Sequence, residues 1–269
     1  MERKKYLVVT AGGSGTRMGA FLPKQFMELR GKPILRLTIE RFMEACEDIQ
    51  VITVLPSSYM GSWRDYCVRE SFHCPQHLVS GGFTRFHSVQ NALEQVPDGA
   101  LVAIHDGVRP FMSALKIRAL FDLAREHPAV IPVLPVTDTL KVLEKKADGT
   151  LVAAPEVVDR SRIYGAQTPQ IFHSELLKKA YTQGFDTLFT DDASVARKYG
   201  IPLTFAEGER LNIKITTPED LVLAQAILSQ LSQRWCQSRP VYEVLLKSFT
   251  HTWRSMGSSR EIMVSVDWM

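Results

Sequence analysis

Two positively charged side chains stand beside a glycine-rich segment near the start of the chain. Residues 11–19 read Ala-Gly-Gly-Ser-Gly-Thr-Arg-Met-Gly, so that Arg17 lies inside the segment, and Lys24 follows it. Glycines let backbone N–H groups approach a ligand closely, and successive N–H groups beside a fixed cation form a cradle for phosphate oxygens. The segment therefore predicts binding of a triphosphate, with a plain turn after a first strand as the alternative.

This segment matches neither of two standard nucleotide-binding patterns. In the dinucleotide pattern G-x-G-x-x-G, Gly13 and Gly15 fit, but Met18 stands where the third glycine belongs. The P-loop pattern fails because no Gly-Lys-Ser/Thr closes the segment. Any nucleotide site formed here must be of another type.

Further charged residues follow apolar or loop segments later in the chain. Asp106 and Arg109 come after the apolar run 101–104. A charged pair just past a buried strand rarely helps folding, so both are candidates for ligand contact, with a structural ion pair as the alternative. Asp191 and Asp192 could bind a metal ion, or they could cap the helix expected after them.

The elements that must position these residues alternate in type over the first half of the chain. Short apolar runs predict buried strands, and amphipathic stretches between them predict helices. Such alternation favours a mostly parallel sheet covered on both faces, with the ligand crevice outside the carboxyl ends of the strands. The expected strands are 6–10, 51–55, 77–79 and 101–104, and the expected helices are 33–45, 58–72 and 84–96.

The second half departs from this alternation. A strand over 129–136 contains Pro132 and Pro135, which favours an edge or bent position. Residues 138–160 predict an extended two-stranded arm, and because an isolated hairpin is marginal in water, we expect it to pack on a second subunit. After the arm we expect a loop at 164–170 and strands at 171–172, 203–205 and 211–215. We also expect three helices: one capped by Ser174 and reaching 183, one that begins at 190–194 and ends at Gly200, and one from Thr217 to 232.

Composition excludes several classes of protein. The chain has 269 residues, 45% of them hydrophobic, which is enough for one large domain or for one domain with additions. A net charge of +3 gives no reason to expect a nucleic-acid or membrane partner. The four cysteines lack C-x-x-C spacing, so neither a zinc site nor a redox pair is indicated. With no signal peptide or membrane-spanning run, we expect a soluble cytoplasmic protein.

The end of the chain differs from the rest. Residues 233–269 contain three of the four tryptophans, and an apolar residue recurs every four positions over 241–253, which is enough for one amphipathic helix. No function is assigned to this extension.

Taken together, the loops resemble those of one family, the 2-C-methyl-D-erythritol 4-phosphate cytidylyltransferases of the non-mevalonate isoprenoid pathway. The resemblance covers residues 4–232 and rests on nine segments in order: AGGSGTRMG, PKQF, SGGFTRFHSV, HDGVRPF, PVTDTLK, VVDR, GAQTPQIF, FTDDAS and NIKITTPEDL. It implies an α/β, Rossmann-like, three-layer nucleotidyltransferase fold over 1–232 with a protruding β-arm, and a homodimer joined through that arm. It also implies a divalent cation, usually Mg²⁺, bound mainly through the phosphates of CTP rather than by protein ligands.

The resemblance also implies the reaction. A phosphate oxygen of methylerythritol phosphate would attack the α-phosphorus of CTP, giving 4-diphosphocytidyl-2-C-methyl-D-erythritol and pyrophosphate. A phosphate monoester is largely dianionic at neutral pH because its second pKa is about 6, so the attack needs no general base. The alternatives are a ribitol 5-phosphate cytidylyltransferase and a non-catalytic nucleotide-binding protein.

By the same resemblance, particular residues receive roles. The implied catalytic residues are Arg17, Lys24, Arg160 and Lys214, where Arg17 and Lys24 stabilise the α-phosphate. The implied nucleotide contacts are Ala11, Gly12, Gly13, Gly15, Gly81, Gly82, Arg85, Ser88 and Asp106. The implied contacts to methylerythritol phosphate are Asp106, Arg109, Thr139, Arg160 and Lys214, of which Thr139 and Arg160 would reach the partner subunit's site. Solvated surface cations and plain glycine turns are the structural alternatives.

Three features depart from the family pattern. Phe83 occupies a position where many relatives have an acidic residue, which puts a ribose contact there in doubt. Thr137 replaces an arginine that some relatives have, and the extension after 232 has no counterpart in the family core.

Overall fold

The computed structural model describes residues 3–13 and 23–231. The chain divides into two compact units, Met1–Leu221 and Val222–Met269. Of the second unit, residues 222–231 are described, and they are helical. The predicted domain boundary at 232 stays a prediction, and the amphipathic helix expected over 241–253 lies outside the described residues.

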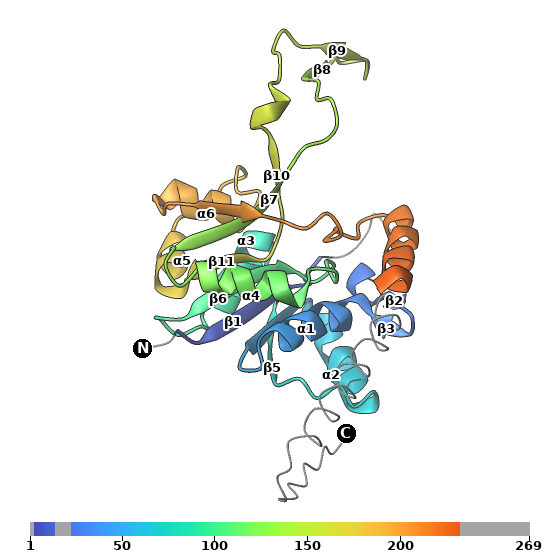
Figure 1. Ribbon diagram of the computed structural model, residues 1–269, viewed down its shortest axis with the longest axis vertical. Helices are drawn as coiled ribbons and strands as arrows, with labels where there is room; N and C mark the ends of the chain where they lie inside the picture. Colours follow the sequence, from blue (N-terminus) through green and yellow to red (C-terminus); the bar gives the residue numbers. More distant parts are fainter. Residues whose placement is uncertain (1–2, 14–22, 232–269) are drawn as a thin grey trace, which may run out of the picture. The chain divides into compact units, whose positions relative to one another are not determined.

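An eight-stranded sheet organises the described part of the first unit (Figure 1). Strands β1 (Lys5–Thr10), β4 (Gln50–Leu55), β5 (Gln76–Ser80) and β6 (Leu101–Asp106) run parallel, with β1 between β4 and β6. Strand β11 (Gln170–His173) is antiparallel to β6 and to β7 (Ala129–Pro135), and β12 (Thr204–Glu207) is parallel to β7. The mostly parallel sheet is therefore confirmed.

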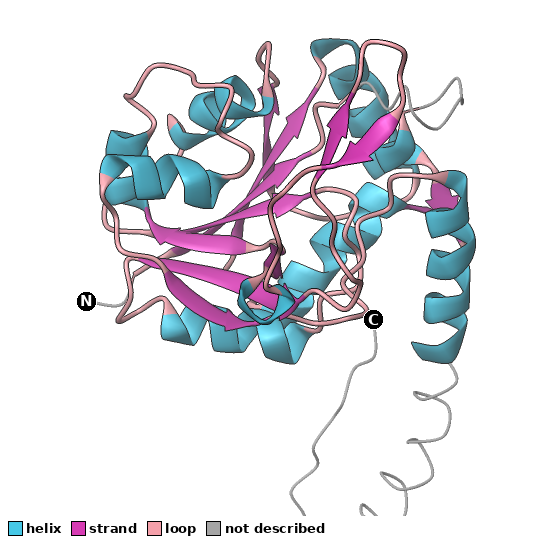
Figure 2. Ribbon diagram, turned by 90° about the horizontal axis from the view of Figure 1, so that it is seen from above, coloured by secondary structure: helices cyan, strands magenta, loops and turns pink. Residues whose placement is uncertain are grey.

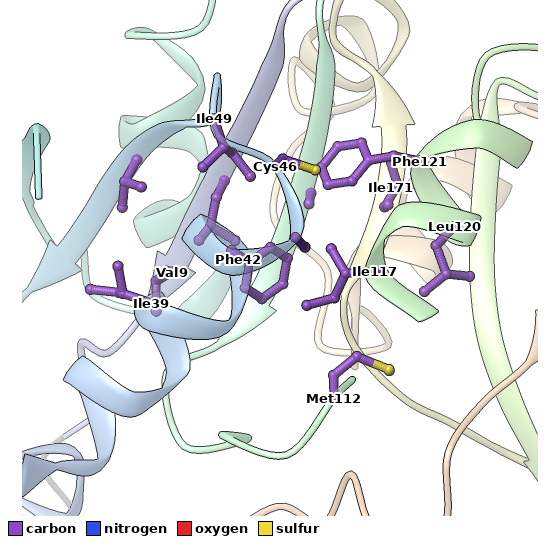
Figure 3. Packing of buried hydrophobic residues seen from close by; sticks show 14 of the residues in the cluster. Val9, Ile39, Phe42, Cys46, Ile49, Met112, Ile117, Leu120, Phe121 and Ile171 are labelled. Atoms are coloured by element: carbon purple, nitrogen blue, oxygen red, sulfur yellow. The ribbon is translucent and has the colours of Figure 1, made fainter. Parts of the chain in front are cut away.

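Helices cover both faces of the sheet (Figure 2). Helices α1 (Ile34–Ala45), α2 (Met60–Arg69) and α4 (Ala114–Leu123) contribute to one buried cluster, whereas α3 (Arg85–Leu93), α5 (Ser174–Ala180) and α6 (Asp192–Tyr199) contribute to the other. Successive residues of β1 alternate between the clusters, because side chains of a strand point to opposite faces. In Figure 3, Phe42 of α1 lies beside Ile117 of α4.

The arm is present and pairs only with itself among the described strands. Strands β8 (Leu143–Lys145) and β9 (Leu151–Ala153) form a separate antiparallel pair, away from the main sheet in Figure 1. Its turn contains Gly149 at φ +88°, and Asp148 accepts a hydrogen bond from the N–H of Thr150 at 2.9 Å. The predicted two-stranded arm is thus confirmed.

Several expectations for the second half are wrong. Of the edge or bent position expected for 129–136, the edge is excluded, because Val130 of β7 pairs with Thr204 of β12 and also with Ile171 of β11, which lie on opposite sides of β7. The expected loop at 164–170 begins with a further strand, β10 (Tyr164–Ala166), paired with β7. Residues 211–215 form no strand.

Most of the helix caps predicted from side chains are found in the structure. Asp191 caps α6 in a capping box with Ser194, and Gly200 ends that helix at φ +94°. Thr217 caps the helix over 218–231, because its Oγ1 accepts a hydrogen bond from the N–H of Asp220 at 3.3 Å. Ser174 is not a cap: its hydroxyl donates to the Pro97 carbonyl at 2.8 Å and accepts from the Ala100 N–H at 3.0 Å. Helix α5 therefore begins without that cap, and it ends at Ala180.

Short elements complete the described chain. They are the 3₁₀ turns η2 (Lys24–Phe26), η3 (Ser57–Tyr59) and η4 (Arg160–Arg162), and the strand pair β2 (Glu28–Leu29) with β3 (Lys32–Pro33). None of the described helices has the length and apolar character needed to cross a bilayer.

Candidate active site

The carboxyl ends of β1, β4 and β6 meet at one edge of the sheet, and the loops leaving them are held to one another. Thr10 at the end of β1 is in register with Asp106 of β6 and with Val54 of β4. The N–H of Ala11 donates to the Val54 carbonyl at 2.9 Å, and the N–H of Gly107 donates to the Thr10 carbonyl at 3.0 Å. This edge is where a parallel sheet places its ligand crevice.

A cavity of about 430 Å³ opens at this edge. Its lining comes from the first glycine segment, the turn η2, the start of α3, the end of β6 and the chain near 214. The described lining residues are Thr10, Ala11, Gly12, Gly13, Lys24, Gln25, Gly82, Phe83, Thr84, Arg85, Ser88, Asp106, Val108 and Lys214. Most of the residues predicted to bind the nucleotide thus line one hollow.

The turn that carries Lys24 is fixed by its neighbours. Gln25 is buried, and its Nε2 donates to the Ala11 carbonyl at 2.6 Å and to the Gly13 carbonyl at 3.3 Å. The ring of Phe26 stacks on Tyr59, with centroids 5.2 Å apart. A buried amide thereby connects the turn bearing Lys24 to the glycine segment. Sequence analysis missed Gln25, although its place next to Lys24 in PKQF was visible.

A second glycine pair forms the opposite loop. The N–H of Gly81 donates to the Leu55 carbonyl at 2.8 Å, and that of Gly82 donates to Ser88 Oγ at 3.0 Å. A β-carbon added at Gly82 would lie 2.5 Å from the β-carbon of His87, so only glycine fits there. The Ser88 hydroxyl also donates to the Thr84 carbonyl at 2.9 Å. Ser88, a predicted nucleotide contact, therefore also holds this loop in place.

Asp106 is the centre of a cluster of charges at the end of β6. Its Oδ2 lies 3.1 Å from Nζ of Lys214 and 3.0 Å from Nε of Arg109. Burial by itself would raise the pKa of Asp106. The positive charges of Lys214 and Arg85, followed by that of Arg109, outweigh burial and hold the pKa well below its usual range. Asp106 is therefore ionised at neutral pH.

Arg109 itself is not among the lining residues, and a second partner holds it. Its Nη1 donates to the carbonyl of Asn212 at 2.8 Å. Asn212 is fully buried, and its Nδ2 donates to the Thr168 carbonyl at 2.9 Å. These bonds place the chain that carries Lys214 against β6. Asn212 was not singled out from the sequence, because nothing local marks its contacts with residues more than 40 positions away.

His105, next to Asp106 in β6, is fully buried. Its ring lies 4.9 Å from that of Phe42, and its Nε2 lies 3.0 Å from the Arg109 carbonyl, so Nε2 carries the proton and donates. Burial lowers the pKa of His105 to about 4. The imidazole is therefore neutral at pH 7, and its bond to the Arg109 carbonyl helps to hold the turn that follows β6.

Arg85 reaches the cavity wall with a buried partner behind it. Its guanidinium forms two hydrogen bonds to the carboxylate of Asp192, at 2.9 and 2.5 Å. Asp192 is fully buried and also accepts a hydrogen bond from the Tyr181 hydroxyl at 2.6 Å. Asp191 thus caps a helix while Asp192 holds an arginine, and neither belongs to a group of His, Cys, Asp or Glu side chains that could hold a metal ion in the described chain.

Two predicted site residues lie on the arm instead of in this cavity. Arg160, in η4, is exposed, and its Nη1 donates to the Thr137 carbonyl at 2.7 Å. Thr139 is exposed in the segment between β7 and β8, and it belongs to no strand. Arg17 and Gly15 lie outside the described residues. The cavity as described thus combines Lys24, Arg85 and Lys214 with one carboxylate, which suits a ligand with several negative charges.

Comparisons with known proteins show the family of the chain. Residues 6–230 match the family model described as 2-C-methyl-D-erythritol 4-phosphate cytidylyltransferase. An enzyme of that name from Bacteroides thetaiotaomicron is 46% identical over 225 residues, which is 84% of this chain and 100% of the relative. One from Geobacillus thermodenitrificans is 39% identical over 226 residues, covering 82% of this chain and 96% of the relative.

Solved structures give the same result. The crystal structure of 4-diphosphocytidyl-2C-methyl-D-erythritol synthase from Anaerococcus prevotii superposes with a TM-score of 0.68 at 29% identity, covering 84% of this chain and 96% of that one. The crystal structure of 2-C-methyl-D-erythritol 4-phosphate cytidylyltransferase from Thermus thermophilus superposes with a TM-score of 0.65 at 31% identity, covering 84% and 98%. The chain therefore belongs to the 2-C-methyl-D-erythritol 4-phosphate cytidylyltransferase family.

Proposed function

We propose that the protein transfers CMP from CTP to 2-C-methyl-D-erythritol 4-phosphate, with release of pyrophosphate, in isoprenoid precursor biosynthesis. The observation that carries this proposal is that Lys24 and Lys214, from segments 190 positions apart, line one cavity at the carboxyl ends of β1 and β6. Membership of the family supports the choice of both substrates. We also propose a cytoplasmic location, since the three described cysteines, Cys46, Cys67 and Cys74, are free thiols, as is usual in a reducing compartment.

The chemical difficulty of this reaction is to bring one anion onto another. The attacking phosphate is already largely dianionic at neutral pH, so a general base is unnecessary. Phosphoryl-type transfer is accelerated mainly by positioning and by cations placed where negative charge accumulates. We assign that task to Lys24 and Arg17 at the α-phosphate and to Lys214 at the attacking phosphate.

The backbone and the remaining charges would hold the two substrates. Ala11, Gly12, Gly13 and Gly15 would give N–H donors to the triphosphate, and Gly81, Gly82, Arg85 and Ser88 would contact the nucleoside. Asp106 and Arg109 would contact methylerythritol phosphate. The two bonds from Arg85 to Asp192 support this assignment, because they fix the guanidinium before the ligand arrives.

A divalent cation fits the described lining only if the nucleotide brings most of its ligands. Asp106 is the one carboxylate among the described lining residues, and its low pKa keeps it ionised. Mg²⁺ commonly keeps several waters and takes one or two carboxylates together with substrate phosphates. When bound, the ion would neutralise part of the triphosphate charge, and Asp106 is the side chain that could hold it.

We further propose a homodimer in which the arm of each subunit completes the partner's site. Leu143, Leu151 and Val157 are exposed apolar residues on the arm, and a hairpin of this size needs a surface to pack on. Arg160 and Thr139 lie on the same arm, where they could reach a second copy of the cavity. No nucleic-acid or membrane partner is proposed.

The direct test is pyrophosphate release by the purified full chain. With CTP, Mg²⁺ and methylerythritol phosphate, we expect turnover, and with ribitol 5-phosphate in its place we expect little. The reverse preference would reassign the protein to ribitol phosphate. Absence of turnover with both acceptors, in protein that still binds CTP, would leave a nucleotide-binding protein.

A further inference from the structure

Phe83 is an aromatic side chain that is fully exposed and nevertheless lines the cavity. Its relative exposure is 101%, the largest among the exposed apolar side chains of the described residues. It stands between Gly82 and Thr84, which also belong to the lining. A ring left in water at the mouth of a ligand cavity gains from being covered, because water is then released from its apolar surface.

The backbone that carries this ring is held on both sides. Before it, the N–H groups of Gly81 and Gly82 are bonded to the Leu55 carbonyl and to Ser88 Oγ. After it, the Thr84 side chain caps α3 by accepting the N–H of His87 at 3.4 Å. The ring of Phe83 is perpendicular to that of His87, with centroids 6.4 Å apart and planes at 89°, and it remains fully exposed, so most of its surface is left for other contacts. Phe83 is thus presented from an anchored turn.

The chemistry of the two substrates indicates which of them this ring can cover. Methylerythritol phosphate is a hydroxylated chain with a phosphate, and it offers no flat apolar face. CTP carries a planar base, while its triphosphate suits the cations Lys24 and Lys214 of the same cavity. An aromatic side chain stacks well on a base because every base has a π-face.

We propose that Phe83 stacks on the nucleobase of bound CTP and supplies affinity for the nucleoside half of that substrate. This inference rests on the proposed function, since it takes CTP as the ligand. Stacking is tolerant of base identity, so the ring strengthens binding of CTP and UTP alike, and discrimination between the two must come from hydrogen bonds elsewhere in the site.

The experiment measures binding to the full chain by calorimetry with Mg²⁺ and no acceptor, so that no reaction occurs. Phe83→Ala should raise the Kd of CTP by about 5- to 50-fold, which is about 1 to 2.3 kcal/mol. The Kd of inorganic tripolyphosphate, which lacks a base, should change less than about twofold. Phe83→Tyr, which keeps the ring, should stay within about threefold of the unaltered chain.

Phe205→Ala is the matched control, because Phe205 is 60% exposed on β12 and is not a lining residue; it should leave the Kd of both ligands unchanged. The proposal is overturned if Phe83→Ala leaves CTP binding unchanged, or if it weakens CTP and tripolyphosphate equally. Normal turnover with an unchanged Kd in Phe83→Ala would reject the stacking role alone. Binding of CTP that depends on Phe83, without turnover, would reject the proposed function alone, and an unaltered chain that does not bind CTP would reject both.

Discussion

The edge of the sheet and the arm hold their charged side chains in different ways. At the edge, Asp106 is 7% exposed and pairs with two cations, and the loops around it are bonded to one another. On the arm, Arg160 is exposed, and β8 and β9 pair only with each other among the described strands. The difference teaches that the described chain by itself fixes the phosphate-binding half of the proposed site, whereas the arm's residues are held by few contacts of their own; in the proposed homodimer, a second subunit would fix them.

The largest expected effect is on catalysis at the edge. Lys24→Ala should lower kcat by a factor on the order of 10² to 10³, equivalent to about 3–4 kcal/mol of lost charge stabilisation. Lys179→Ala, which removes an exposed lysine on α5, is the matched control and should leave kcat unchanged. Steady-state kinetics of pyrophosphate release give both values, and an unaltered kcat in Lys24→Ala would remove that lysine from the mechanism.

Mixing inactive subunits tests whether arm and edge act across a dimer. Lys24→Ala and Arg160→Ala chains, each weak alone, should recover about a quarter of normal activity after exchange in equal amounts. Half of the dimers are then mixed, and each mixed dimer has one intact site. Native mass spectrometry of chains of different mass would establish the exchange. Exchanged mixtures without recovery would contradict the cross-subunit role.

The free energy of unfolding should depend on pH because His105 is buried at the edge of the sheet. The pKa of His105 is lowered to about 4 by burial, whereas an unfolded histidine titrates near 6.5. Above about pH 6.5 the His105 imidazole is neutral in both the folded and the unfolded state, so its contribution to the free energy of unfolding is fully present. As the pH falls toward 4, only the unfolded state binds the proton, and the free energy of unfolding decreases by an amount on the order of 3 kcal/mol.

Denaturant unfolding at several pH values would measure this loss. His105→Gln should remove much of the slope between pH 6.5 and 4, whereas His73→Gln, at an exposed position, should preserve it. A slope in His105→Gln as steep as that of the unaltered chain would show that the imidazole is not buried and neutral.

The smallest expected effects compare one glycine from each region. A β-carbon at Gly107 would lie 3.0 Å from Cβ of Ala11 and 3.2 Å from the Thr10 carbonyl oxygen, so Gly107→Ala should cost about 1–3 kcal/mol of unfolding free energy. At Gly149 there is open space but φ is +88°, so Gly149→Ala should cost about 1 kcal/mol, confined to the arm. If Gly107→Ala and Gly149→Ala lowered the free energy of global unfolding equally, as measured by denaturant unfolding, the proposed difference between the sheet edge and the arm would be contradicted.

Sequence patterns predicted the parallel half of the sheet because apolar β-branched runs and helical periodicity are local signals. Sequence patterns failed where an element is formed by contacts with residues far away in the sequence. Tyr-Gly-Ala at 164–166 has no strand pattern of its own and becomes β10 through pairing with β7. Residues 211–215 alternate between apolar and polar side chains as a strand would, yet they form no strand. Their conformation is held by the burial of Asn212 and Ile215, which leaves Lys214 at the cavity.

The site was predictable to a similar degree. The glycine segments, Lys24, Asp106 and Lys214 could be found from residue type and resemblance, and their described residues lie at the same edge. The partnership of Arg85 with Asp192 could not, because 107 positions separate the two residues and only the folded sheet brings α3 and α6 together. Likewise, the expected nucleotide contact of Ser88 gave no sign that its hydroxyl also accepts a hydrogen bond from Gly82.

Isotope labelling tests most directly the claim that a substrate phosphate attacks the α-phosphorus of CTP. Methylerythritol phosphate labelled with ¹⁸O at its three terminal phosphate oxygens should give a product that retains all three labels and pyrophosphate that contains none, as read by mass spectrometry. Loss of a label from the product, or its appearance in pyrophosphate, would contradict the account.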